Sequence, residues 1–167
     1  KAGKPTRSFI GMQVAHLGIA VFVIGVTMVG AYQEEKDVRM LAGESVSVGG
    51  YQIQLQSVNA VPGPNYKAMQ GTFLLTRNGK LEATMYPEKR SYFSSTMPMT
   101  EAAIDAGLTR DIYVSLGEEL EDKAWAVRVY YKPFVDWIWG GCVLMALGGL
   151  LAMSDKRYRM KLKKAAA

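Results

Sequence analysis

Histidine and cysteine are scarce in this sequence. The 167 residues include one histidine, His16, and one cysteine, Cys142, and positions 32–133 contain neither. That central segment therefore has no ligand set for zinc or copper, no disulfide, and no cysteine-based motif for covalent haem attachment. Its acidic residues show no pairing that spacing alone identifies, and we interpret the run at 118–122 as a solvated turn rather than an acid–base pair.

Charge is absent from two long stretches. Positions 10–31 and 137–154 contain no Asp, Glu, Lys or Arg. Each stretch is close to the roughly 20 residues that a helix needs to cross the hydrocarbon core of a bilayer. The sequence therefore predicts two transmembrane helices, at 10–31 and 134–153. A signal peptide is the alternative for the first, but its apolar core would be about 7–15 residues long and would end at a cleavage site of small residues.

Acidic residues are rare in the two terminal segments that flank the predicted helices, whereas basic residues are common there. The segments 1–9 and 154–167 carry nine Lys and Arg against Asp155 alone, while 32–133 carries 11 Lys and Arg against 13 Asp and Glu. Short basic flanks stay in the cytoplasm, so we predict cytoplasmic ends and an outward central segment. The basic tail is also suited to contact anionic membrane lipid. It lacks the interleaved aromatic residues of a nucleic-acid site, and we predict no nucleic-acid partner.

The central segment alternates with a period of two. The stretch "YQIQLQSV" places apolar and polar side chains on opposite faces, which is typical of a half-buried strand. "TFLLTRNGKLEATMY" predicts a hairpin, because Asn78 and Gly79 suit the two positive-φ positions of a type I′ turn. "DIYVSL" and "AWAVRVYY" predict further strands, and "TEAAIDAG" predicts one short helix. We expect a small antiparallel β-barrel or sandwich of about 100 residues.

His16 lies inside the first predicted transmembrane helix, where an ionisable side chain is costly and usually functional. Three interpretations remain open from the residues alone. It is a haem or metal ligand, it has another buried function, or it is a neutral imidazole that packs against a neighbouring helix. Gln13, one turn away on the same face, is a candidate to shape the surroundings of the ring.

Glycines occupy the opposite face of this helix. Gly11, Gly18 and Gly25 form a stripe, and Gly141 and Gly148 have the same spacing of seven in the second helix. Small residues allow close helix packing in membranes. We therefore predict that the two helices pack through these glycines and leave His16 for a different partner.

Several separated blocks resemble one known family. "GMQVAHLGIAVFVIGV", "YPEKRSYFSSTMPMTEAAIDAGLTRDIYVSLGEE" and "VRVYYKPFVDWIWGGCVLMALGGLLAMSDKR" are similar to the C-terminal part of CcmF, the haem lyase subunit of System I cytochrome c maturation. The resemblance implies that His16, in "AHLG", is one of two axial ligands of a membrane-bound haem b. It also implies a bacterial inner-membrane protein with a periplasmic central domain.

The resemblance further implies partners. These are the N-terminal part of the lyase, the haem chaperone holo-CcmE, apocytochrome c with its thiol-handling subunits, and quinol as the electron donor. The resemblance implies that the haem b reduces the haem carried by CcmE as that haem is attached to apocytochrome c.

The family's tryptophan-rich motif and its other haem-liganding histidines belong to its N-terminal part and are missing here. Trp137 and Trp139 do not form that motif. The second axial ligand must come from elsewhere, either upstream in a longer protein or from a separate chain. The first residue is Lys1 rather than Met, so we expect a processed or excised piece. Two alternatives remain. One is a related lyase devoted to nitrite reductase maturation, and the other is a non-catalytic membrane adaptor whose outward domain recruits partners.

Overall fold

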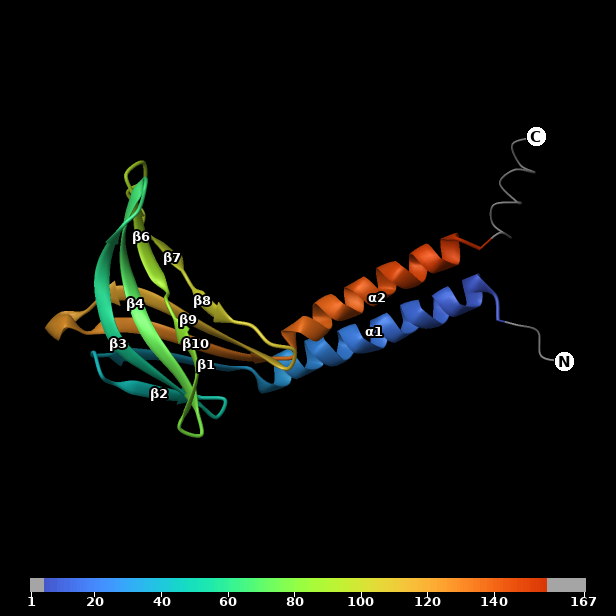
Figure 1. Ribbon diagram of the computed structural model, residues 1–167, viewed down its shortest axis with the longest axis horizontal. Helices are drawn as coiled ribbons and strands as arrows, with labels where there is room; N and C mark the ends of the chain where they lie inside the picture. Colours follow the sequence, from blue (N-terminus) through green and yellow to red (C-terminus); the bar gives the residue numbers. More distant parts are fainter. Residues whose placement is uncertain (1–4, 156–167) are drawn as a thin grey trace. The chain divides into compact units, whose positions relative to one another are not determined.

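A computed structural model describes residues 5–155, which divide into two compact units (Figure 1). One unit is helical, and the other, Tyr32–Pro133, is a β-domain built from strands. Part of the predicted basic flanks lies outside the described residues. This applies to Lys1, Lys4 and every Lys and Arg that follows Asp155.

The helical unit contains two helices, α1 (Arg7–Tyr32) and α2 (Val135–Met153). Both are long and apolar enough to cross a membrane, judged by length and composition alone. Most of their side chains are exposed in this unit. The helices thus offer apolar surface outward and bury little between themselves except small residues.

The two helices pack through glycine. A methyl group added at Gly18 would lie 2.8 Å from the carbonyl oxygen of Gly141, and one added at Gly11 would lie 2.5 Å from that of Gly148. Those distances are too short for a carbon atom, so only glycine lets the two backbones approach this closely. The packing predicted from the two stripes is confirmed, and the order of the contacts makes the helices antiparallel.

An acidic side chain caps the start of α1. The Ser8 backbone N–H donates to Oδ2 of Asp155 at 2.9 Å, and the Phe9 N–H donates to Oγ1 of Thr6 at 3.2 Å. These bonds satisfy amide groups that have no acceptor within the helix, and a carboxylate is favoured at the positive end of the helix dipole. Asp155, the single acid of the predicted basic tail, is therefore a structural residue that joins the two helices.

The β-domain contains ten strands and one short 3₁₀ turn within the described residues. Their bounds are β1 (Glu34–Met40), β2 (Ser45–Val48), β3 (Tyr51–Pro62), β4 (Tyr66–Arg77), β5 (Lys80–Met85), β6 (Glu88–Tyr92), β7 (Met99–Glu101), β8 (Ala103–Asp105), β9 (Arg110–Glu119), η1 (Glu121–Lys123) and β10 (Trp125–Pro133).

The strands form two antiparallel sheets. One has the order β1-β10-β9-β8, and the other has the order β2-β3-β4-β6-β7 with β5 also paired to β4. Figure 1 shows the strands of the two sheets. Alternate side chains of both sheets meet in one apolar core. The largest fully buried side chains include Phe73, Met40, Ile53, Leu55, Leu75, Ile112 and Leu116. The expected β-rich domain between two helices is confirmed, and it is a sandwich.

The predicted hairpin is confirmed at its turn. Asn78 and Gly79 have φ angles of 50° and 76°, as a type I′ turn requires. Strand β5 then pairs with β4 from Lys80 opposite Arg77.

The short helix predicted at "TEAAIDAG" is wrong. This segment forms two three-residue strands instead, with Glu101 of β7 opposite Glu88 and Ala103 of β8 opposite Val114. Strand β7 belongs to one sheet and β8 to the other, so the chain turns a corner between the sheets. Pairing on both sides of this corner satisfies the backbone that a helix would have satisfied locally, and tertiary context overrides helix propensity.

Candidate functional site

His16 lies on the face of α1 that is turned away from α2. It is exposed, as are Gln13, Ala20 and Thr27, whereas Gly11, Gly18 and Gly25 are buried. The predicted separation of the two faces is therefore confirmed. Within the described residues, the imidazole does not hydrogen-bond to α2, so the interpretation of a histidine packed against the neighbouring helix is not supported inside this chain.

The ring of His16 is oriented by its own helix. Its Nδ1 lies 2.8 Å from the carbonyl oxygen of Met12, one turn earlier. A carbonyl oxygen can only accept, so Nδ1 carries the proton and donates it. The Nε2 lone pair of the neutral ring is then available to a metal. Met12 thus takes the position near the ring N–H for which the sequence suggested Gln13.

This arrangement fits one axial ligand of a haem. Imidazoles that bind metals commonly donate their other N–H to a carbonyl or carboxylate, which fixes the ring and raises the basicity of the ligand nitrogen. His16 is the only histidine of the chain. Residues 5–155 contain no group of three or more His, Cys, Asp and Glu side chains that could hold a metal ion. The described residues therefore offer one imidazole, and no second histidine, as a candidate ligand.

Cys142 adds no further chemistry to this site. It is exposed on α2 and is the only cysteine of the chain. A single thiol cannot form an intramolecular disulfide, and it lacks the companion ligands of a structural metal site.

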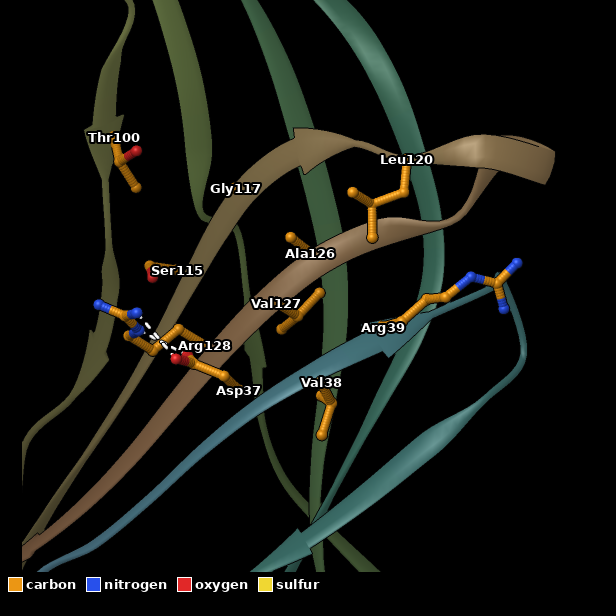
Figure 2. A pocket seen from close by; sticks show the side chains of 10 residues that line it. All are labelled: Asp37, Val38, Arg39, Thr100, Ser115, Gly117, Leu120, Ala126, Val127 and Arg128. Carbon is orange, nitrogen blue, oxygen red and sulfur yellow. Dashed lines mark hydrogen bonds and ion pairs between the residues drawn. The ribbon is translucent and has the colours of Figure 1, made fainter.

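A cavity of about 540 Å³ lies on the four-stranded sheet of the β-domain (Figure 2). Its floor is formed by small residues, Ser115, Gly117 and Ala126, and its rim includes Arg128 and Asp37. Two hydrogen bonds join the rim residues. Nε of Arg128 donates to Oδ1 of Asp37 at 2.5 Å, and Nη2 of Arg128 donates to Oδ2 of Asp37 at 2.8 Å. These bonds lower the pKa of Asp37. Because the guanidinium of Arg128 is already paired with Asp37, it is not free to bind an anion in this hollow.

The acidic run at 118–122 has the exposed position that the sequence predicted. It includes the end of β9 and the start of η1, and Asp122 has a positive φ of 61° in the connection to β10. Asp122 approaches Arg39 at 3.6 Å, but both side chains are largely exposed. These residues form a solvated tip rather than an acid–base pair.

Comparison with known proteins identifies the family. The family model described as the CcmF C-terminal beta-sandwich matches residues 31–133. The chain is 53% identical over 158 residues to the cytochrome c-type biogenesis protein CcmF of Pseudomonas aeruginosa and 52% identical to that of Escherichia coli, covering 95% of this chain and 24% of each relative. The cytochrome c-type biogenesis protein NrfE of Haemophilus influenzae is 35% identical over 154 residues, 92% of this chain and 24% of that protein.

A solved structure of the cytochrome c haem lyase CcmF has a similar fold. It matches with a TM-score of 0.73 and 21% identity, and the match covers 89% of this chain and 25% of that one. The chain thus spans about a quarter of the length of the curated relatives that it matches. With a two-sheet β-domain in the matched range and two flanking helices, the chain belongs to the CcmF family, of which it represents the C-terminal part.

Proposed function

We propose that this chain supplies one axial ligand, His16, to a b-type haem of a cytochrome c haem lyase. The bond from Nδ1 of His16 to the Met12 carbonyl carries the proposal, because it leaves Nε2 exposed and unprotonated in the neutral ring. Membership of the CcmF family supports the reaction class, since the solved protein of similar fold is named a haem lyase.

We place the chain in the bacterial inner membrane. In this arrangement 10–31 and 134–153 are the membrane spans, 32–133 lies in the periplasm, and the flanks 1–9 and 154–167 lie in the cytoplasm. Support comes from the apolar character of α1 and α2 and from the basic flanks.

The residues of this chain have limited and separate tasks in the reaction. The Nε2 atom of His16 would bind the haem iron, and the Met12 carbonyl holds the imidazole ring in its orientation. When bound, haem b supplies a one-electron carrier. We propose that the chain thereby serves the reduction that accompanies transfer of haem from holo-CcmE to apocytochrome c, with quinol as the donor. The N-terminal part of the lyase, in the same protein or in a separate chain, supplies the second axial histidine.

A visible spectrum of the assembled lyase tests the proposal. The His16→Ala variant, produced together with the N-terminal part, should accumulate in the membrane but lose the b-type Soret band and cytochrome c maturation. Gln13→Leu is the matched control on the same face of α1, and it should retain the band. External imidazole should restore part of the band to His16→Ala, because it fills the vacant axial position.

The adaptor alternative gives a different result. If His16 has no ligand role, His16→Ala should retain both a normal haem spectrum and cytochrome c maturation. That outcome would overturn the assignment of His16 even though the family is established.

A further inference from the structure

The loop between β8 and β9 presents an apolar side chain at its tip. Residues 106–109, with the sequence Ala-Gly-Leu-Thr, contain no charged side chain. Leu108 is 79% exposed, and no other large hydrophobic side chain among the described residues is more exposed. A single exposed leucine is common on protein surfaces, so the place of this loop in the fold decides what the leucine means.

Hydrogen bonds from both sides hold this loop in its conformation. Asp111 is 4% exposed, and its Oδ1 accepts from the Gly107 N–H at 3.1 Å. The Arg110 N–H donates to the Gly107 carbonyl at 3.2 Å, which closes the turn. The guanidinium of Arg110 donates to the Asp105 carbonyl at 2.9 Å and pairs with the Asp105 carboxylate. The charges that flank the tip are therefore paired, and a tip held in place loses little conformational entropy when it binds.

Strand register places this loop beside the junction with α2. Arg110 lies opposite Pro133, the last residue of the β-domain. Cα atoms of such opposed residues are roughly 4.5–5.5 Å apart. Phe134 alone separates Pro133 from the first residue of α2. Residues 106–109 immediately precede Arg110, so the loop lies within a few residues of the point at which the chain enters α2.

Amphipathic side chains mark the same level of the chain. Trp137 and Trp139, both exposed, follow near the start of α2. Just before the junction, Nζ of Lys132 lies 5.3 Å from the ring centroid of Tyr113 and 5.1 Å from that of Tyr130. Tryptophan, tyrosine and lysine are typical of the headgroup level of a bilayer, where an apolar body and a polar tip are both accommodated.

We propose that the loop 106–109 docks the β-domain onto the bilayer, with Leu108 inserted between lipid acyl chains at the outer surface. The inference rests on the proposed placement of α1 and α2 in the membrane. Removal of apolar surface from water favours insertion, and the uncharged tip carries no ionised group into the lipid. With the two chain connections, the loop makes a third attachment and limits tilting of the β-domain relative to the membrane.

Fluorescence quenching of the full chain in lipid nanodiscs tests this proposal. With the native thiol removed by Cys142→Ser, Thr109→Cys carries an environment-sensitive NBD fluorophore next to Leu108. Thr96→Cys is the matched control, because it lies next to Met97, which is 75% exposed in the loop between β6 and β7. We expect doxyl groups on the lipid acyl chains to quench the fluorophore at position 109. Iodide in solution should quench only the fluorophore at position 96.

Two substitutions of the leucine itself test whether its apolar side chain is the anchor. Leu108→Asp, added to the chain labelled at Thr109→Cys, should abolish doxyl quenching and admit iodide, because a carboxylate is costly to remove from water. Leu108→Met keeps an apolar side chain of similar size and should retain the doxyl quenching. Circular dichroism confirms that each variant is folded. Equal doxyl quenching with Leu108→Asp would overturn the proposal.

A third labelled position separates this proposal from the membrane placement on which it rests. Val143 is 57% exposed on α2, so a fluorophore at Val143→Cys should be quenched by doxyl lipid if α2 lies in the bilayer. Quenching at position 143 without quenching at position 109 would overturn the loop insertion and leave the membrane placement intact. Absence of quenching at both positions would overturn the two together.

Photo-crosslinking in the assembled lyase tests whether lipid or protein covers the loop. A photoreactive benzoylphenylalanine that replaces Thr109 should attach to lipid when the chain is produced together with the N-terminal part of the lyase. Attachment to the N-terminal part, or to a second copy of this chain, would overturn the proposal, because a protein surface would then cover Leu108.

Discussion

A single hydrogen bond decides the chemical character of His16. Because the Met12 carbonyl can only accept, the proton of the neutral ring is held at Nδ1 and the lone pair at Nε2. The sequence predicted the residue and its helix face, since one histidine in an uncharged stretch is conspicuous. It could not predict the tautomer, which depends on the rotamer of the side chain against its own helix.

Glu88 of β6 makes stability depend on pH. It accepts hydrogen bonds from Nε of Arg90 and from the amide of Gln70, both at 2.7 Å. The bond from Arg90 lowers the pKa of Glu88 below its ordinary value of 4.5, although burial opposes this. The carboxyl group of Glu88 therefore binds a proton more readily in the unfolded chain than in the folded chain. The stabilisation is present above the ordinary pKa and is lost as the pH falls through the lower pKa of the folded state.

We predict that Glu88→Gln reduces the acid sensitivity of the β-domain. Between about pH 6 and about pH 3, the melting temperature of the unaltered chain should fall more steeply than that of the variant. Thermal unfolding followed by circular dichroism measures both slopes. Glu121→Gln, at the exposed tip, is the control and should follow the unaltered chain. Identical slopes for all three proteins would contradict the prediction.

At the scale of the helices, close approach rather than side-chain burial holds α1 and α2 together. A methyl group at Gly141 would lie 2.6 Å from the backbone nitrogen of Phe22 and 2.7 Å from the carbonyl oxygen of Gly18. Both atoms belong to the backbone of α1, so they cannot move aside as a flexible side chain would. A methyl group added at the neighbouring Gly140 would meet no such atom within 4 Å.

We therefore predict opposite outcomes for substitutions at two adjacent glycines. Gly141→Val should force the helices apart and destabilise the folded chain by about 1–3 kcal/mol, the usual cost of overpacking. Gly140→Val should change stability far less. Unfolding in mixed micelles, with helix content as the signal, compares the two. Equal destabilisation would mean that the glycine contacts do not hold the helices together.

The strands show which parts of the fold the sequence could predict. Where one face is buried, as in β3, alternation of apolar and polar residues predicted the strand. Asn78-Gly79 predicted the hairpin turn between β4 and β5. Strand β1, "EEKDVRM", was not predicted, because it is an edge strand with mostly exposed, charged side chains. The corner at β7 and β8 was predicted as a helix, because the strands that pair with it, β6 and β9, lie outside the segment whose local pattern was read.

At the scale of the whole molecule, the two units have different chemistry. The helical unit carries the one histidine, and the β-domain carries a groove of about 510 Å³ that is lined by β3, β4, β6 and the end of β9. No sequence pattern predicted that groove, because it arises from strands of unequal length in two sheets.

The proposed topology predicts where reagents reach the chain. With the native thiol removed by Cys142→Ser, Ser94→Cys places a thiol in the exposed loop between β6 and β7. A maleimide that cannot cross the inner membrane should label this thiol in cells with a permeable outer membrane. Ala165→Cys, in the basic tail, should react only after the inner membrane is opened, because basic flanks are retained in the cytoplasm. The reverse pattern would invert the topology. It would also place the β-domain in the cytoplasm.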